Sequence, residues 1–295
     1  MIGGSLGTGK TPLVVVTTLA MTAFAANSVL ARLALADDDI DPGTYTSIRL
    51  ATGTLMLLPL IFLSRGLGPA DAAKSGSWVS AASLFVYAAG FSYAYVTLGA
   101  GTGALILFGV VQAVILGTAL VRGERPGWGT YVGLTAALAG LVYLVAPGVS
   151  APDPTGSVLM VLAGAGWAVY TLRGRGGPDP LAATGANFLL SLPFCVALFV
   201  LVITFDGGRV SAHGILLATA SGALASGLGY TLWYLALPLL TRAQAGVIQL
   251  SPVPLAAAGG LLLLGEPLTA RLAAATVLIL GGVALAVVTP DRRTS

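Results

Sequence analysis

The chain has 295 residues, of which 56% are hydrophobic and only 8% are charged, and its formal net charge is +3. Soluble domains carry about 25% charged residues, so this composition excludes a water-soluble globular protein and indicates an integral membrane protein. The small basic excess requires no nucleic-acid partner, because the basic residues gather on one side of the predicted membrane topology.

Apolar segments of about 20 residues, the length that crosses a bilayer, recur along the chain. Their Gly, Ala and Leu content predicts helices, since β-barrel strands would be about ten residues of alternating polarity. We therefore predict an all-α integral membrane protein. Ten segments are interpreted as transmembrane helices: 12–31, 44–64, 77–98, 102–121, 127–146, 155–172, 181–204, 212–237, 242–264 and 270–289.

Residues 1–11 precede the first span and are predicted to be a flexible cytoplasmic tail. Within them, residues 4–11 (GSLGTGKT) match the letters of a nucleotide-binding P-loop. Such a loop needs a strand before it and a soluble helix after it, whose amides face the phosphates. Only three residues precede this string and a membrane span follows it, so we interpret the match as coincidental.

The distribution of basic residues predicts the orientation in the membrane. If the N-terminus is cytoplasmic, ten Lys and Arg residues fall on the cytoplasmic side, against Arg209 and Arg271 on the other. This asymmetry follows the positive-inside rule and predicts that both termini, including the tail 290–295, are cytoplasmic. We expect a bacterial inner membrane as the location.

Two Gly-Glu pairs end long apolar runs, and they indicate an internal duplication. Glu124 and Glu266 lie 142 residues apart, and Ile106 and Ile248 each precede their glutamate by 18 positions. A weaker echo pairs Asp41-Pro42 with Asp179-Pro180.

The duplication predicts two repeats, at 12–147 and 155–289, with five spans each. An odd number of spans places the second repeat upside down in the bilayer. Inverted repeats of this kind are typical of secondary transporters.

The second half reads LSPVP at 250–254, GEPLT at 265–269 and LGGV at 280–283, and this order resembles the EamA-type domain of the drug/metabolite transporter superfamily. The first half is less similar, because Val110 and Gln112 stand opposite Pro252 and Pro254. The resemblance covers nearly the whole chain. It implies export of small metabolites, with amino-acid exporters well represented, and a cavity among spans 1–4 and 6–9 that spans five and ten brace.

No Asp, Glu, Lys or His lies near the centre of a predicted span. Buried ionisable groups are usual in proton-driven pumps, so we expect a facilitator or a coupling without a central carboxylate. His213 and Cys195, the single His and the single Cys, make no metal site, and we expect no cofactor.

Polar and aromatic residues inside the spans are the candidates for substrate binding, because amides can bind a zwitterion and aromatic faces can enclose apolar groups or meet an ammonium. Arg49 either extends to the outer interface or faces a cavity, where it would bind a carboxylate. The predicted substrate-binding residues are Trp167, Asn27, Tyr93, Gln249, Tyr87, Gln112 and Arg49.

Four residues are candidates for gating or for structure. Glu124 and Glu266 either mark helix ends or act as gates, and roughly 30 Å of bilayer separates them. Pro252 and Pro254 remove two amide donors and would leave carbonyls of the preceding turn free, as a packing kink or at a cavity.

We therefore expect a secondary transporter that exports small organic metabolites, most plausibly amino acids, by alternating access. Export of drugs, nucleotide sugars or lipid-linked compounds stays open, and the rival classes are a channel and an intramembrane enzyme. An enzyme would need a convergent nucleophile or metal cluster, and none is visible, so the chain is predicted not to be an enzyme. The expected partners are a small-molecule substrate and the lipid bilayer, and the chain is expected to be a monomer or a dimer.

Overall fold

The computed structural model describes residues 10–66, 68–122, 127–148, 150–174, 179–240 and 248–288. Within these ranges the chain forms helices and connections, and the strand-type pairing is one isolated antiparallel bridge between Ile40 and Val210. The all-helical prediction is therefore confirmed for this part of the chain. Residues 1–9, the tail at 290–295 and Glu124 lie outside the described residues.

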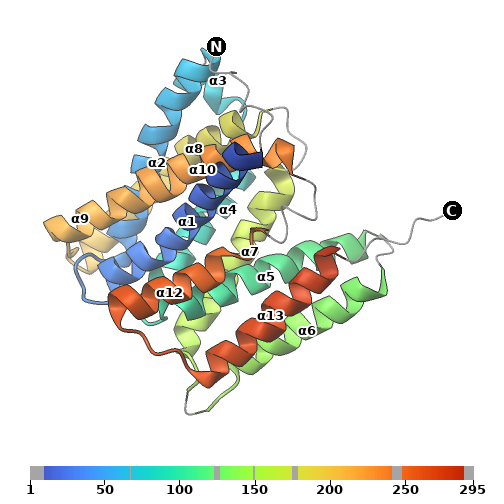
Figure 1. Ribbon diagram of the computed structural model, residues 1–295. Coiled ribbons are helices and arrows are strands. Elements are labelled where there is room, and N and C mark those ends of the chain that lie inside the picture. Colours follow the sequence, from blue (N-terminus) through green and yellow to red (C-terminus); the bar gives the residue numbers. More distant parts are fainter. Residues whose placement is uncertain are drawn as a thin grey trace.

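The first half contributes six helices to the described part of the chain (Figure 1). The short α3 lies in the connection between two long helices. The bounds are α1 Lys10–Leu35, α2 Pro42–Arg65, α3 Pro69–Ala73, α4 Trp78–Ala94, α5 Ala100–Val121 and α6 Trp128–Val145.

The second half follows the same order, but one of its long helical runs changes geometry three times. That run consists of α9, a π-helix η1, α10 and a 3₁₀ turn η2. The bounds are α7 Pro154–Gly174, α8 Pro180–Phe205, α9 Ala212–Thr219, η1 Ala220–Leu228, α10 Gly229–Ala236, η2 Leu237–Leu239, α12 Pro252–Leu264 and α13 Ala270–Val288.

Most of these helices are long and apolar enough to cross a bilayer. Among the described residues, seven helical runs meet that length and composition. Three shorter apolar helices accompany them, at Trp78–Ala94, Pro252–Leu264 and Ala270–Ala286. The chain is thus a multi-pass membrane protein.

The same local signal starts a helix in each half. Asp41 Oδ1 accepts a hydrogen bond of 2.7 Å from the amide of Thr44, and Asp179 Oδ1 accepts one of 3.1 Å from the amide of Ala182. A proline follows each aspartate at the first helical position, where no amide donor is needed. The aspartate–proline echo in the sequence therefore corresponds to the same element in both halves.

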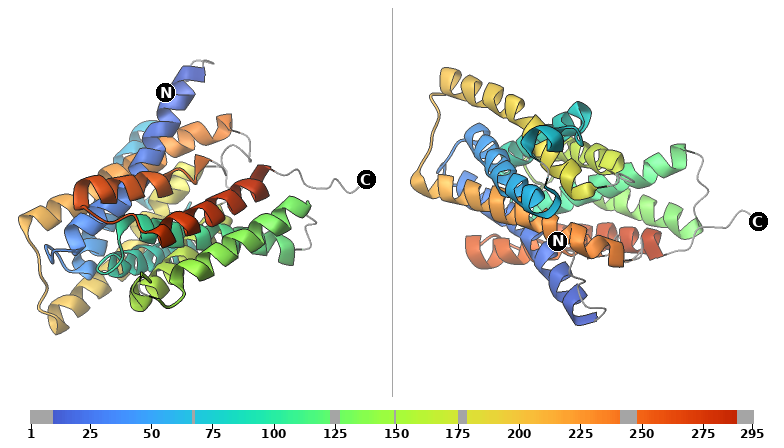
Figure 2. Two further views of the ribbon diagram at one scale, coloured as in Figure 1. Left: turned by 60° about the horizontal axis from the view of Figure 1, so that its bottom comes forward. Right: turned by 90° about the horizontal axis from the view of Figure 1, so that it is seen from above.

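The packing of the helices repeats when the two halves are exchanged (Figures 1 and 2). α4 and α5 pack on α7, and correspondingly α10 and α12 pack on α1. α2 pairs with α8, α5 with α12 and α6 with α13, so each of these helices meets its own counterpart. The two halves consequently interlock, and the centre of the molecule is built from both.

α6 and α13 lie side by side along one flank of the molecule (Figures 1 and 2). Their contact depends on glycine, because a methyl group added at Gly140 would lie 2.8 Å from Cβ of Leu278. A methyl group at Gly282 would lie 2.9 Å from the amide nitrogen of Ala137. Small residues of this kind let helix backbones approach closely in membranes, and the pair joins the ends of the two halves.

The start of α12 corrects one sequence interpretation. The predicted span 242–264 places Pro252 and Pro254 inside a helix, whereas α12 begins at Pro252. Both prolines therefore occupy the first turn, where amides have no helical partner in any case. The carbonyl of Ile248 is also not left free, because it accepts from the amide and the hydroxyl of Ser251 at 3.0 and 2.7 Å.

Candidate functional site

Arg49 lies at the centre of a buried polar cluster and is 2% exposed. Its Nη2 donates to the hydroxyl of Tyr87 at 2.9 Å, and its Nε lies 3.4 Å from Oγ of Ser226. The guanidinium carbon also lies 5.2 Å from the ring centre of Tyr87 and 4.6 Å from that of Phe91. Of the two alternatives that the sequence left open, the structure therefore excludes extension to the outer interface.

The cluster contains donors that have no acceptor. Nη1 of Arg49 is buried and makes no hydrogen bond within the described part of the chain, and the buried hydroxyl of Tyr45 makes none of ordinary geometry, although Ser221 is its polar neighbour. Tyr45 precedes Arg49 by one helical turn, so the two side chains share a face of α2. A buried donor without an acceptor lowers the stability of the fold by about 1–3 kcal/mol, and a charged donor lowers it by more. This arrangement is therefore expected to serve a function, such as binding a ligand.

The π-helix η1 turns two serines toward Asn27 of α1. Oγ of Ser221 donates to Oδ1 of Asn27 at 2.7 Å, and Oγ of Ser226 lies 3.4 Å from the same oxygen. Residues five apart diverge by roughly 140° around an α-helix, whereas the wider turn of a π-helix brings them to one face. η1 thereby links Asn27 to the side chain of Arg49.

An aromatic wall adjoins this cluster and comes from helices of both halves. The ring of Trp167 lies 4.8 Å from Tyr87, 5.2 Å from Tyr170 and 5.4 Å from Tyr230, measured between ring centres. Thr184 of α8 holds two of the tyrosines in place, because its hydroxyl accepts from Tyr170 at 3.2 Å and donates to Tyr234 at 3.0 Å. The wall is thus fixed by stacking on one side and by hydrogen bonds on the other.

Four of the seven predicted substrate-binding residues come together here: Arg49, Tyr87, Asn27 and Trp167. The other three lie elsewhere.

The hydroxyl of Tyr93 is beside Gly43, at the start of α2, and Gln249 lies in the turn that precedes α12. Gln112 is buried in α5, and no hydrogen bond connects it to the cluster among the described residues.

Sequence reasoning did not single out Tyr45, Ser221, Ser226 or Thr184. Tyr45 could have been found, since a tyrosine four residues before a buried arginine shares its helix face. Ser221 and Ser226 are five residues apart, a spacing that places them on different faces of an α-helix. Their common role therefore depends on the π-helix, which the sequence pattern does not indicate.

A second polar cluster closes one end of the bundle. Nε of Arg32 lies 3.2 Å from Oε1 of Glu266, and its Nη1 donates to the carbonyls of Tyr95 and Val96 at 3.0 and 2.8 Å. Oε2 of Glu266 accepts from the amide of Ala100, the first residue of α5, at 2.8 Å. A carboxylate at a helix N-terminus is favourable, so Glu266 joins α1, α5 and the α12–α13 connection.

The ion pair joins distant parts of the sequence. Arg32 is close in sequence to the acidic run 37–39, but its carboxylate partner is Glu266. The two are brought together because α12 packs against both α1 and α5.

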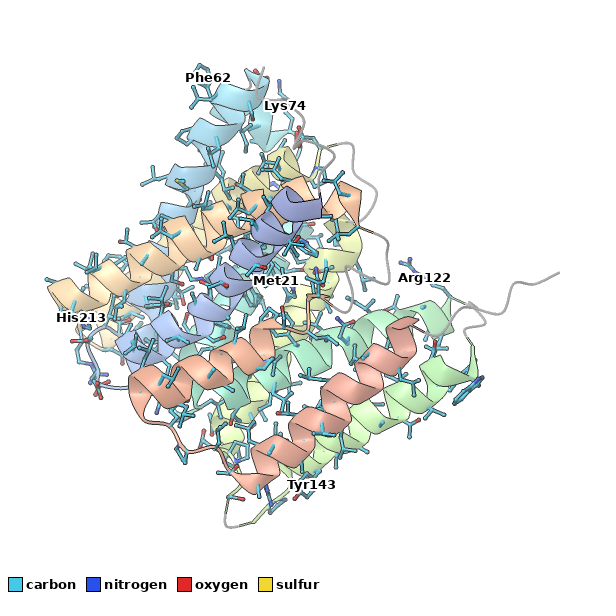
Figure 3. The ribbon with its side chains drawn as sticks, in the orientation of Figure 1. Met21, Phe62, Lys74, Arg122, Tyr143 and His213 are labelled. Atoms are coloured by element: carbon cyan, nitrogen blue, oxygen red, sulfur yellow. The ribbon has the colours of Figure 1, made fainter. Side chains whose placement is uncertain are left out.

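At the same end, the α1–α2 and α8–α9 connections pair with each other. The amide of Ser211 donates to the carbonyl of Asp39 at 2.7 Å, and the amide of Asp41 donates to the carbonyl of Arg209 at 2.9 Å. Nδ1 of His213 lies 2.6 Å from Oδ2 of Asp39. In Figure 3, His213 and Tyr143 lie toward this side of the molecule, and Lys74 and Arg122 lie toward the opposite side.

Loss of the Asp39 carboxylate should loosen this pairing. Hydrogen bonds from His213 and Ser211 hold the pKa of Asp39 below its usual value. The pairing is therefore favoured above the ordinary aspartate pKa of about 3.9 and should be lost only as the pH falls through the lowered value. In Asp39→Asn, the separated fraction should rise about twofold to fivefold, the range for exposed ion pairs. Distances between spin labels at residues 37 and 205 would measure it.

Asp38→Asn is the matched control, because Asp38 forms a solvent-exposed pair with Arg209 in the same connection. An equal effect of the two substitutions would contradict a special role for Asp39.

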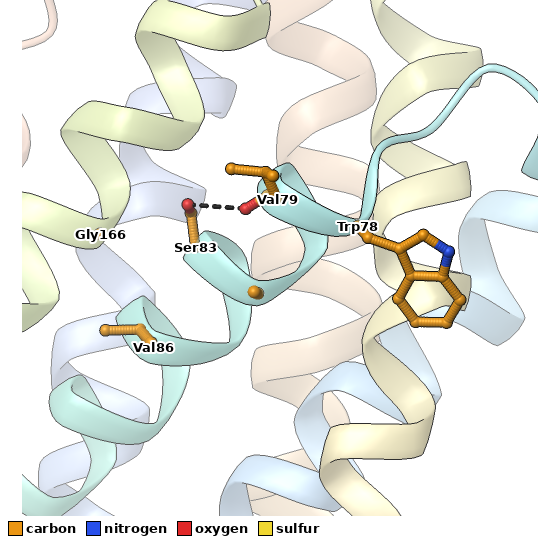
Figure 4. A pocket seen from close by; sticks show the side chains of 6 residues that line it. Trp78, Val79, Ser83, Val86 and Gly166 are labelled. Carbon is orange, nitrogen blue, oxygen red and sulfur yellow. Dashed lines mark hydrogen bonds between the residues drawn. The ribbon is translucent and has the colours of Figure 1, made fainter.

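Two cavities of the described residues lie outside the buried cluster. One, of about 230 Å³, lies at the closed end and is lined by Arg32, Thr102 and Glu266 among others. The other, of about 420 Å³, is a wide-open recess on α4 bordered by Trp78, Val79 and Val86, with Ser83 bonded to its own helix (Figure 4). Its lining is apolar and exposed, which suits lipid chains.

The described residues hold no group of three His, Cys, Asp or Glu side chains that could bind a metal ion.

Comparison with known proteins gives the class of the chain. A sequence profile of the EamA-like transporter family matches residues 12–146 and again 154–288, one match in each half. The chain therefore belongs to the EamA-like transporter family.

Individual relatives are similar over different lengths. "Uncharacterized protein PA1977" of Pseudomonas aeruginosa is 53% identical over 270 residues, which are 91% of this chain and 92% of that protein. The threonine/homoserine exporter RhtA of Escherichia coli K12 is 35% identical over 159 residues, 52% of each chain. A crystal structure of another protein matches with a TM-score of 0.61 at 21% identity, covering 91% of this chain and 97% of the other, and shows the fold alone.

Proposed function

We propose that this protein is a secondary transporter that exports amino acids by alternating access. Ten spans would form two inverted five-helix repeats, at 12–147 and 155–289. The chain would lie in the bacterial inner membrane with both termini cytoplasmic, as a monomer or a dimer. Its partners would be the lipid bilayer and a small-molecule substrate.

The observation that carries this proposal is the buried cluster around Arg49. Polar and ionisable side chains inside the membrane are costly, and they usually mark a substrate path. Here Arg49 and Tyr87 of the first half meet Trp167, Ser226 and Tyr230 of the second. A site built from both halves is where a rocking motion between them would alternate access.

The packing pattern supports the inverted arrangement. Because the main contacts between the halves have counterparts when the halves are exchanged, the same kinds of interface are available for opening either end. The contacts of Arg32 and Glu266, together with the paired connections at Asp39, close one end. In the proposed topology this is the outer end, so the conformation is closed to the outside.

Two observations support an amino acid as the substrate. The relative RhtA, similar over about half its length, is named as a threonine/homoserine exporter. The cluster itself offers a cation for a carboxylate and aromatic faces for a side chain or an ammonium.

Transport by the reconstituted protein tests the proposal. Proteoliposomes should move labelled amino acids with saturation, and should not move sugars or inorganic cations. Trp167→Ala should lower transport of large apolar amino acids about tenfold more than that of small ones, because aromatic contacts contribute about 0.5–1.5 kcal/mol beyond their buried area. Expression and monodispersity are to be checked first. Saturable transport of sugars alone would refute the amino-acid assignment.

A further inference from the structure

We propose that Arg49 is the anchor for a substrate carboxylate, and that the site selects compounds by that carboxylate and not by an amino group. The inference rests on the proposed transport function and names the substrate class of the same cluster.

The charge balance of the cluster is the first argument. Arg49 is buried, yet every acidic side chain in the described residues lies at a helix end, in a connection or in the short α3. Its recorded contacts are two hydroxyl groups and two aromatic faces, all without formal charge. A buried cation without an anion is unfavourable, and a bound carboxylate would supply the missing charge.

The second argument is the surplus of donors. Nη1 of Arg49 is buried without an acceptor, and the buried hydroxyl of Tyr45 has only Ser221 as a polar neighbour and makes no hydrogen bond of ordinary geometry. The hydroxyl of Tyr87 accepts from Arg49 at 2.9 Å, which leaves its own hydrogen for another acceptor. The cluster thus offers donors for the two oxygens of a carboxylate, which accepts and never donates when ionised.

The third argument concerns the rest of the ligand. An ammonium group would find no carboxylate in the described cluster, only the aromatic faces of Trp167, Tyr170 and Tyr230 and nearby hydroxyls. Such faces accept an ammonium and an apolar group alike. Removal of the amino group should therefore weaken binding far less than removal of the carboxylate charge.

Ligand triads test this directly on the full-length protein in detergent. Each triad contains an amino acid, its amide and its deaminated acid, for example phenylalanine, phenylalaninamide and 3-phenylpropanoate, with triads of several side chains. Ligand-dependent increase of the thermal unfolding midpoint reports binding. We expect the amide to bind at least tenfold more weakly than the amino acid, and the deaminated acid to bind within about threefold, since charge-assisted hydrogen bonds are lost only in the amide.

Substitution of Arg49 separates an anchor from a packing residue. In Arg49→Gln the affinities for the acid and for the amide should differ by no more than about threefold, because the cation that binds the carboxylate has been removed. Arg49→Lys keeps the charge without the planar fork and should retain part of the preference. Arg271→Gln is the control, because Arg271 donates to the backbone carbonyls of Leu144 and Ala146, away from the cluster, and should leave the preference unchanged.

The outcomes are separable. If Arg49→Gln is folded and still prefers acid over amide, or if the parent binds both alike, the anchor is refuted while amino-acid transport can stand. If carboxylates bind through Arg49 but no amino acid is transported, the proposed function fails and the anchor stands. If Arg49→Gln does not fold, the same ligands are measured on Tyr45→Phe and Arg49→Lys. A preference for acid over amide that is undiminished in both variants refutes the proposal.

Discussion

Replacement of Glu266 by glutamine should open the closed end of the bundle and slow net transport about tenfold. The substitution removes the charge that holds Arg32 and weakens the cap on the amide of Ala100. Both side chains of the ion pair are about one-fifth exposed, so we place its contribution to the closed state at about 1–3 kcal/mol, between exposed and buried pairs. A loss of 1.4 kcal/mol changes the open fraction tenfold.

Thiol labelling measures the opening. In a Cys195→Ala background, a cysteine in place of Thr102, which lines the cavity at the closed end, should react with an impermeant maleimide faster once Glu266 is changed. Arg32→Gln should have the same effect, and the double variant should add little, because the two residues act as one pair. Unchanged labelling in both single variants would show that this pair does not hold the end closed.

A methyl group at Gly222 should abolish transport. The Cβ of Gly222→Ala would overlap the backbone carbonyl of Arg49 and the hydroxyl of Thr52. α2 and η1 would have to separate, at a cost of about 1–3 kcal/mol or more, and the separation would move Ser226 away from Arg49. We expect both a lower unfolding midpoint and transport below a tenth of the parental rate.

Gly117→Ala is the matched control for this substitution. Gly117 lies inside α5, and an added methyl group there meets nothing within 4 Å. Alanine favours a helix over glycine by up to about 1 kcal/mol, so this variant should be as stable as the parent or more so. Equal losses in Gly117→Ala and Gly222→Ala would indicate that helix flexibility, and not the contact with α2, explains the result.

Much of the architecture could be predicted from the sequence because the signals are local or repeated. The apolar segments predicted the helices, and the aspartate–proline pairs mark the start of α2 and α8. Tyr87, Trp167 and Arg49 were predicted as site residues because aromatic and charged side chains are conspicuous inside apolar spans.

The remainder depends on contacts that no local pattern encodes. Arg32 and Glu266 are 234 residues apart, and only the packing of α12 against α1 and α5 brings them together. Gln249 lies within a continuous apolar stretch, so hydropathy placed it in a span, whereas Pro252 sets the helix start after it. The π-helix also could not be predicted from the sequence, because its residues are small or apolar on every face.

The length of the segment Ala220–Leu228 determines which way the residues after it point. A π-helical turn holds more residues than an α-helical turn, so rewinding the same residues as an α-helix would rotate the following side chains by roughly 100° about the helix axis for each extra residue that the π-helix accommodates. Tyr230 and Tyr234 would then leave Trp167 and Thr184, although no side chain of the wall had been replaced. Changes that convert this stretch between π-helical and α-helical turns are therefore expected to change which compounds are transported, without any substitution in the wall itself.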